Sequence, residues 1–250
     1  MPNSVTIDCF AESVERYRKG YAVVVIDVVR ATTTAITAVA LGRRCLPVVS
    51  LDAAHSVASR LADPLLIGEV DGIMPEGFDI NNSPAALVKR TDLHRPAVLL
   101  SSSGTKLLEA AASCEAVFLG CLRNFTSLAN HLTGSFADVA VIGAGTRGEF
   151  REEDQICCAW VADRLFGLDY RAGNEETAAI AERWRGCRPD AWTRGNSAAY
   201  LRRSQQLDDL EFILGHIDDL QAVFALRDGE VVWEPLARAD PASERELLYD

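Results

Sequence analysis

Short apolar runs alternate along this chain with segments in which apolar residues recur at helical spacing. The first run, Val23 to Ile26, is mostly β-branched and predicts a buried strand, and the apolar positions from Ala35 to Leu41 predict a helix after it. The same order of strand and then helix is expected in further pairs of segments: 45–50 and 51–62, 63–70 and 85–93, 96–105 and 106–112, 116–124 and 125–132, and 138–150 and 151–167. This alternation predicts a three-layer α/β/α fold with a largely parallel or mixed sheet.

The pattern changes after Gly167. Helices and then a β-hairpin that turns at Asp228-Gly229 are expected, at 175–186, 196–207, 208–215 and 222–236. We therefore expect an α/β domain over 1–167, which carries most of the active-site loops, and a C-terminal α+β region over 168–250. The sequence leaves open whether this helical and hairpin region packs on the domain or forms a second lobe.

Composition narrows the class of protein. The 250 residues include 36 Asp and Glu against 25 Lys and Arg, a net charge of -11 that disfavours nucleic acid and anionic membranes as partners. The cysteines contain no C-x-x-C pair, and the chain shows neither a signal peptide nor about 18 consecutive apolar residues. We therefore expect a soluble cytoplasmic protein, and the sequence leaves open whether it forms a homo-oligomer.

Acidic residues are the informative class, because several fall at or near predicted strand ends or in the loops beyond: Asp27, Glu69, Glu76, Asp79 and Asp154. Mg²⁺ is bound by one or two carboxylates together with water and phosphate oxygens, so this set predicts a magnesium site. The alternative is that each acid caps a helix or faces solvent. Asp154 lies in the first turn of a predicted helix, where the helix dipole favours acids.

Two strand-to-helix turns could bind a phosphoryl group. In the first, Arg30 offers a guanidinium fork, and the start of the helix at Thr32, Thr33 and Thr34 offers backbone N–H groups. In the second, the turn Ser103-Gly104-Thr105 could hold an anion in the same way. The alternatives are that the threonines only cap the helix and that the serine-rich segment only makes a tight turn.

A dinucleotide enzyme is the rival from a different class. The segment GAGTRG, residues 143–148, matches G-x-G-x-x-G directly after a predicted strand. However, the acids at 152–154 open the next helix and would repel a pyrophosphate, and no strand ending in an acid follows at about 20 residues. The chain also lacks a Walker A sequence. It has neither H-E-x-x-H nor G-x-S-x-G, which disfavours zinc and Ser-His hydrolases.

With these loops identified, the chain resembles the 2-phosphosulfolactate phosphatase family across most of its length. The matching stretches include VIDVVRATTTAITAVALG, IGEVDGIMPEGFDINNSP, SSSGTKLLEAA, LGCLRN and IGAGTRGEFREEDQICCAWVADRL. The resemblance implies an α/β, Mg²⁺-dependent phosphatase that releases sulfolactate and phosphate from 2-phosphosulfolactate, a step toward coenzyme M. The chain departs from the family pattern at Ser103, which stands where Asn is usual, and at Asp71 and Asn81, which replace residues that are commonly Gly.

Together, the residues and the resemblance predict a Mg²⁺-dependent phosphomonoesterase for a small, anionic, phosphorylated 2-hydroxy acid. Asp27, Arg30 and Glu69 are the expected catalytic residues, with Asp27 and Glu69 the first-choice metal ligands. Asn82 or Arg147 is expected to meet the carboxylate or sulfonate end of the substrate. Water held by the metal is favoured over Asp27 as the attacking group. The alternatives are a nicotinamide-dependent oxidoreductase that uses GAGTRG and a metabolite-binding relative without turnover.

Overall fold

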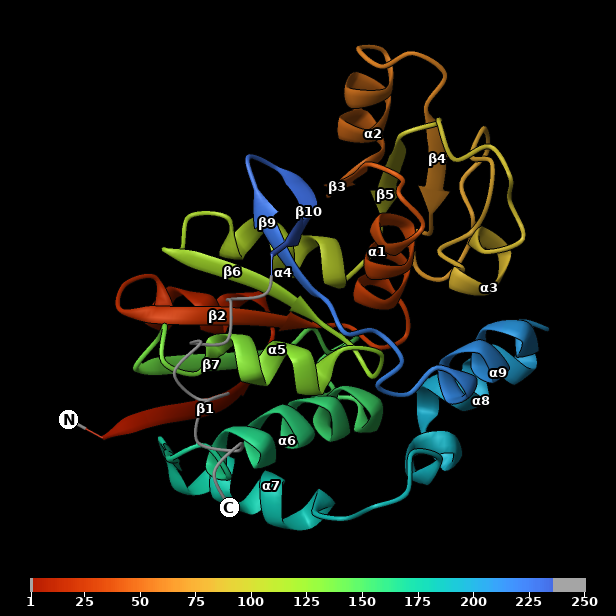
Figure 1. The fold of residues 1–250 in the computed structure, drawn as a ribbon. Coiled ribbons are helices and arrows are strands. Elements are labelled where there is room, and N and C mark those ends of the chain that lie inside the picture. Colours follow the sequence, from red (N-terminus) through yellow and green to blue (C-terminus); the bar gives the residue numbers. More distant parts are fainter. Residues whose placement is uncertain (1, 236–250) are drawn as a thin grey trace, which may run out of the picture.

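The computed structural model describes residues 2–235, and its strands form one sheet in the order β4-β5-β3-β10-β9-β6-β2-β7-β1-β8 (Figure 1). The strands are β1 (Asn3–Cys9), β2 (Tyr21–Ile26), β3 (Cys45–Val48), β4 (Leu65–Gly68), β5 (Ala97–Leu100), β6 (Ala116–Gly120), β7 (Asp138–Gly143), β8 (Tyr170–Ala172), β9 (Val223–Arg227) and β10 (Glu230–Glu234). The helices are η1 (Ala11–Tyr17), α1 (Ala31–Ala40), α2 (Leu51–Ala58), α3 (Pro84–Leu87), α4 (Gly104–Ala111), α5 (Phe125–Leu132), α6 (Glu152–Phe166), α7 (Glu175–Trp184), η2 (Ala191–Arg194), α8 (Asn196–Arg203) and α9 (Leu207–Gly215).

Helices cover both faces of this sheet, so the predicted α/β class and its three layers are confirmed. Strand β2 shows how the layers form, because neighbouring side chains of a strand point to opposite faces. Val24 and Ile26 pack in one core with residues of α5 and α6, whereas Val23 and Val25 pack in the other with residues of α1 and α4. A strand buried on both faces explains the uninterrupted apolar run in the sequence.

The sequence pattern did not indicate strands β1 and β8. Strand β1 pairs in parallel with β7, from Ser4 opposite Asp138 to Cys9 opposite Gly143, and β8 pairs with its other edge. Only the central residues of β1 are buried, and β8 has only three residues. Neither strand therefore contains an apolar run long enough to stand out.

The C-terminal hairpin lies inside the sheet rather than beside it. Strand β9 pairs antiparallel with β6, and among the described residues β10 meets β3 through a single pair, Val231 with Cys45. Strands from both sides of residue 167 thus belong to one sheet. The prediction of two regions stays a prediction, and its last residues, 236–250, lie outside the described part of the chain.

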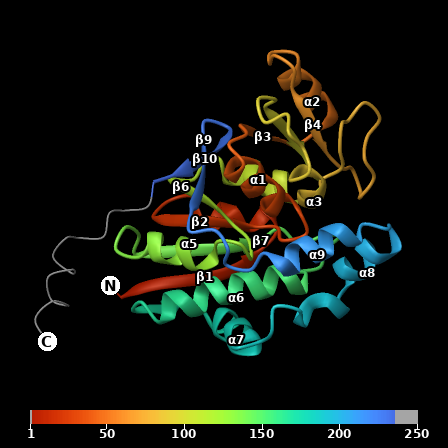
Figure 2. The same cartoon turned by 45° about the vertical axis from the view of Figure 1, so that its right-hand side comes forward.

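The parallel strands bring the candidate loops to one edge of the sheet. Strands β2, β6 and β7 run in parallel, so the segments after Ile26, Gly120 and Gly143 emerge at the same edge. Figures 1 and 2 show α8 and α9 at the same end of the molecule as α3, and α9 contacts α3. Over residues 2–235, no helix has the length and apolar character needed to cross a membrane.

Candidate functional site

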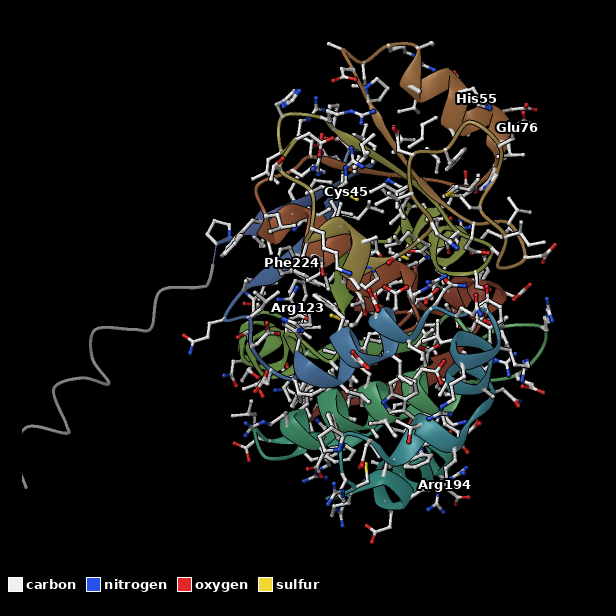
Figure 3. The ribbon with its side chains drawn as sticks, turned by 90° about the vertical axis from the view of Figure 1, so that its right-hand side faces the viewer. Cys45, His55, Glu76, Arg123, Arg194 and Phe224 are labelled. Atoms are coloured by element: carbon white, nitrogen blue, oxygen red, sulfur yellow. The ribbon has the colours of Figure 1, made fainter. Side chains whose placement is uncertain are left out.

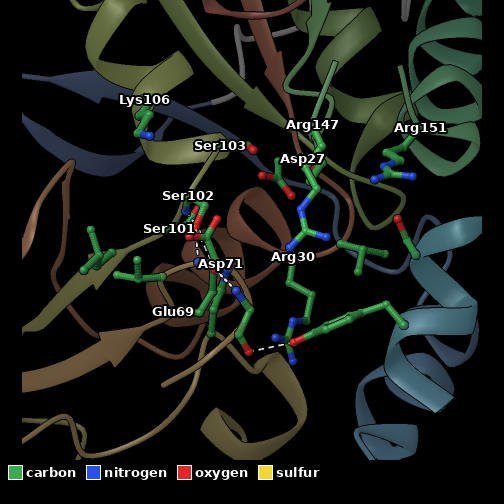
Figure 4. Close-up of a pocket in the computed structure, with 18 of the residues that line it drawn as sticks. Asp27, Arg30, Glu69, Asp71, Ser101, Ser102, Ser103, Lys106, Arg147 and Arg151 are labelled. Carbon is green, nitrogen blue, oxygen red and sulfur yellow. Dashed lines mark hydrogen bonds between the residues drawn. The ribbon is translucent and has the colours of Figure 1, made fainter. Parts of the chain in front are cut away.

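A cavity of about 880 Å³ opens at this edge of the sheet. Its walls carry hydroxyl groups, acids and cations, and the basic residues among them are Arg30, Lys106, Arg147, Arg151 and Arg203. Figure 4 shows Asp27, Arg30 and Arg147 near its middle, with Glu69 on one side and Arg151 on the other. Such a pocket is suited to a small, multiply charged anion.

Asp27 directly follows β2 and is almost completely buried in the pocket wall. One carboxylate oxygen, Oδ1, accepts the backbone N–H of Ala31 at 3.1 Å. The other lies against Gly104, where an added Cβ would be only 2.4 Å from Oδ2. Burial raises the pKa of Asp27 to about 6, the N–H of Ala31 opposes that rise, and the charge of Glu69 adds to it. A cation placed between the two carboxylates would relieve this repulsion.

Glu69 follows β4, and its side chain is fixed by its own loop and the next strand end. Its carboxylate accepts the backbone N–H groups of Gly72 and Ser102, each at 2.6 Å, and the hydroxyl of Ser102 at 2.9 Å. Asp71, in the same loop, has φ +52°, in the region where Gly is favoured and Asp is tolerated. The departure from Gly at this position is therefore compatible with the loop conformation.

Arg30 precedes α1, and its side chain is held by residues in and just before α9. Its Nη1 donates to Gln206 and to the carboxylate of Asp209, and both partners of the ion pair are buried. Asp209 also accepts the hydroxyl of Ser83 at 2.6 Å and the N–H of Ala85 at 3.1 Å. The guanidinium thus has a fixed position in the pocket wall.

The three threonines are buried inside α1, and none of them lines the cavity. The hydroxyl of Thr32 donates to the carbonyl of Asp27 at 2.8 Å, and that of Thr33 donates to the carbonyl of Val28 at 2.8 Å. The hydroxyl of Thr34 is buried without a partner among the described residues. These contacts fix the turn that carries Asp27 and Arg30, and the predicted phosphate contact stays a prediction.

At the start of α4, only Ser103 of the predicted turn lines the cavity. The hydroxyl of Thr105 donates to the carbonyl of Ser101 at 2.8 Å and accepts its N–H at 3.1 Å. The N–H of Gly104 donates to the hydroxyl of Ser101 at 3.1 Å. The tight-turn alternative thus describes the Thr105 contacts, while Ser103 is placed to meet a ligand.

Three of the predicted metal-binding acids lie away from the cavity wall. Asp154 is buried and does not line the cavity, and it accepts the N–H groups of Val28 at 2.9 Å and Gly145 at 3.3 Å. Burial, together with the charge of Glu153, raises the pKa of Asp154. Glu76 is exposed at the outer edge of the molecule (Figure 3), and Asp79 forms an ion pair with Arg95 at 3.1 Å. Of that set, only Asp27 and Glu69 line the cavity.

Asn82 and Arg147, the predicted contacts for the other end of the substrate, both line the cavity. Asn82 is buried, and its Oδ1 has no hydrogen-bond partner in the described part of the chain. Arg147 is exposed and has φ +54°. It belongs to GAGTRG, but α6 begins only at Glu152, so no helix starts within the glycine turn as a dinucleotide site requires.

Several lining residues were missed by the sequence analysis. They include Lys106 and Arg151. They also include three residues of α8, namely Ser197, Tyr200 and Arg203. Among the lining cations, Arg151 forms an ion pair with Glu149, whereas Lys106, Arg147 and Arg203 form none within residues 2–235 and are available to an anion. Helix α8 is polar and amphipathic like any surface helix, so its sequence gives no signal that one face lines a pocket.

The donor set suits Mg²⁺ only if the substrate and water complete it. Among residues 2–235, no cluster of three or more His, Cys, Asp or Glu side chains could hold a metal ion alone. Mg²⁺ commonly takes one or two carboxylates and fills its other positions with water and phosphate oxygens. Asp27 and Glu69 fit that pattern.

The chain matches known proteins of one family. A model of the 2-phosphosulpholactate phosphatase family matches residues 9–229. A relative from Caldanaerobacter subterraneus subsp. tengcongensis is 29% identical over 223 residues, which cover 87% of this chain and 92% of the relative. One from Symbiobacterium thermophilum is 30% identical over 220 residues, 85% and 94% of the two chains. Both relatives carry the name Probable 2-phosphosulfolactate phosphatase.

Proposed function

The chain belongs to the 2-phosphosulfolactate phosphatase family, and on that basis we propose that it hydrolyses 2-phosphosulfolactate to sulfolactate and phosphate. Membership makes it a phosphoric monoester hydrolase. The oxidoreductase alternative is not supported, because the family match includes the GAGTRG segment and α6 begins beyond it.

The observation that carries the proposal is the combination of groups in one cavity. Two carboxylates, Asp27 and Glu69, line it together with a fixed arginine and with cations that no described acid neutralises. A substrate with a phosphate, a carboxylate and a sulfonate carries several negative charges on three carbons. The unpaired cations offer partners for those charges, and the arginine fork offers two parallel hydrogen bonds to a phosphoryl group.

We assign the proposed Mg²⁺ to Asp27 and Glu69. Bound there, it would supply a Lewis acid for the phosphoryl oxygens and lower the pKa of a bound water. Arg30, held by Asp209, would orient the phosphoryl group and stabilise the charge that develops on it. Asp27 is followed by Val28 and Val29 rather than by the second acid of aspartyl-phosphate phosphatases, which favours attack by water.

The test is phosphate release from racemic 2-phosphosulfolactate and from phospholactate, each with Mg²⁺ and with EDTA. Release that requires Mg²⁺ and is faster with the sulfonate substrate supports the proposal. Faster release from phospholactate would move the substrate assignment to phosphate monoesters of 2-hydroxy acids that lack a sulfonate. Ligand binding without release in either buffer would instead indicate a metabolite-binding protein.

A further inference from the structure

The phenol of Tyr200, on α8, joins two walls of the cavity. Its hydroxyl donates to the carbonyl of Gly72 at 2.6 Å, in the loop that carries Glu69. The same oxygen accepts the side-chain amide of Gln206 at 3.3 Å. The hydroxyl therefore uses its donor on the Glu69 loop and one acceptor site on Gln206, which follows α8.

Each of these contacts leads to a group that the proposed reaction needs. The N–H of Gly72 donates to Glu69 Oε2 at 2.6 Å, so the residue that binds Tyr200 through its carbonyl also orients the Glu69 carboxylate. On the other side, Gln206 accepts Nη1 of Arg30 through its Oε1. Gly72 thus connects the Tyr200 hydroxyl to Glu69, and Gln206 connects it to Arg30.

The fit of the loop against the phenol is close. Gly72 has φ +87°, and a Cβ on it would lie 2.5 Å from the Tyr200 hydroxyl oxygen. The loop can adopt this conformation and approach the ring only because position 72 has no side chain.

The contact matters because the two walls belong to different parts of the sheet. Glu69 follows β4, which reaches the rest of the sheet through β5 and β3. Within residues 2–235, β3 meets β10 at a single pair, Val231 with Cys45. Arg30 follows β2, on the other side of that junction. The sheet alone therefore gives limited control over the separation of Glu69 and Arg30.

We propose that Tyr200 is a positioning residue, whose hydroxyl holds the Glu69 loop and Arg30 at the separation that phosphoryl transfer requires. This inference rests on the proposed function. Loss of the hydroxyl should therefore affect the transition state more than the binding of the ground state.

The test is Tyr200→Phe, which removes the hydroxyl and keeps the ring. We expect kcat for phosphate release to fall about 10-fold or more, with KM changed by less than about twofold. Tyr170→Phe is the matched control, because its hydroxyl donates to the carbonyls of Leu132 and Phe136, away from the cavity, and it should keep wild-type kcat. Unchanged kcat in Tyr200→Phe would overturn the proposal, and so would a rise in KM alone, which would make Tyr200 a substrate contact.

Two further measurements separate this inference from the proposed function. In a Glu69→Gln background, Tyr200→Phe should cost much less than it does in the wild type, because both changes act on one group. Hydrogen exchange of a peptide covering 69–73 needs no substrate, and it should be faster in Tyr200→Phe than in Tyr170→Phe. Equal exchange in the two variants contradicts the inference, whereas absence of release by the wild type contradicts only the proposed function.

Discussion

The carboxylate of Asp27 lies against Gly104, so position 104 has no room for a side chain. An alanine Cβ at position 104 would lie 2.4 Å from Asp27 Oδ2 and 2.5 Å from the Cβ of Ala31. We expect Gly104→Ala to displace Asp27, to lower the free energy of unfolding by about 2 kcal/mol and to remove most phosphate release. Gly215→Ala is the control, since a Cβ there meets no atom of residues 2–235 within 4 Å, and it should keep wild-type stability and activity.

Asp27 itself can be tested without relying on turnover. Asp27→Asn keeps an oxygen that can accept the N–H of Ala31, but it removes the charge that attracts a divalent cation. We expect a folded variant whose melting temperature in EDTA is no lower than that of the wild type. The variant should gain no stability from Mg²⁺ and should release almost no phosphate. Mg²⁺ stabilisation equal to that of the wild type would remove Asp27 from the metal site.

At Arg30, the shape of the cation matters as well as its charge. Arg30→Lys keeps the positive charge beside Asp209 but loses the fork that can bind a phosphoryl group through two hydrogen bonds. Activity should fall about 10²-fold while the protein still folds. Arg43→Lys changes an equally buried arginine that binds Asp92 outside the cavity, so it should reduce stability and leave kcat unchanged. A lysine variant with wild-type kcat would argue against the phosphate assignment.

At the scale of elements, the first turn of α6 contains acids that the fold buries. Burial raises the pKa of Glu153 from 4.5 to about 7. Between these two pH values, the folded protein therefore holds a proton that the unfolded chain has released. The resulting stabilisation is complete below pH 4.5 and is lost as the pH rises toward 7.

We therefore expect the wild type, in EDTA, to be less stable at pH 8 than at pH 5, and Glu153→Gln to lose less stability over that interval. The difference between the two proteins should be about 2 kcal/mol, since one pKa unit corresponds to about 1.4 kcal/mol. Urea unfolding at the two pH values measures it. Parallel losses in the two proteins would show that Glu153 ionises as it does in the unfolded chain.

Local patterns predicted the strands and helices around the site because each has its own apolar periodicity. They placed Asp27, Arg30, Glu69 and Ser103 at strand ends, and the structure puts all four in the cavity wall. They could not predict contacts between distant segments, such as Asp209 with Arg30 or Tyr200 with Gly72, because no local pattern encodes them. Asp209 lies in the first turn of α9, where acids are common because the helix dipole is positive there, so its sequence position does not indicate a contact with Arg30.

At the scale of the whole molecule, the sheet depends on the hairpin β9–β10. The hairpin lies between β6 and β3, so a fragment of residues 1–167 would leave both of those edges unpaired. We expect the fragment to show no cooperative unfolding transition in urea and to aggregate, whereas the full chain unfolds cooperatively. A cooperative transition in the fragment would show that the α/β domain predicted over 1–167 folds without the C-terminal region.

The position of this hairpin also sets the order in which the protein can be completed on the ribosome. Strands β3 and β6 emerge early, but the hairpin that separates them in the sheet follows about a hundred residues after β6. Until then, the nascent chain carries two open strand edges with β-branched and aromatic residues, which other chains can pair with. The yield of this enzyme in cells should therefore respond to translation speed and to chaperones that shield such edges, even when the finished protein is stable.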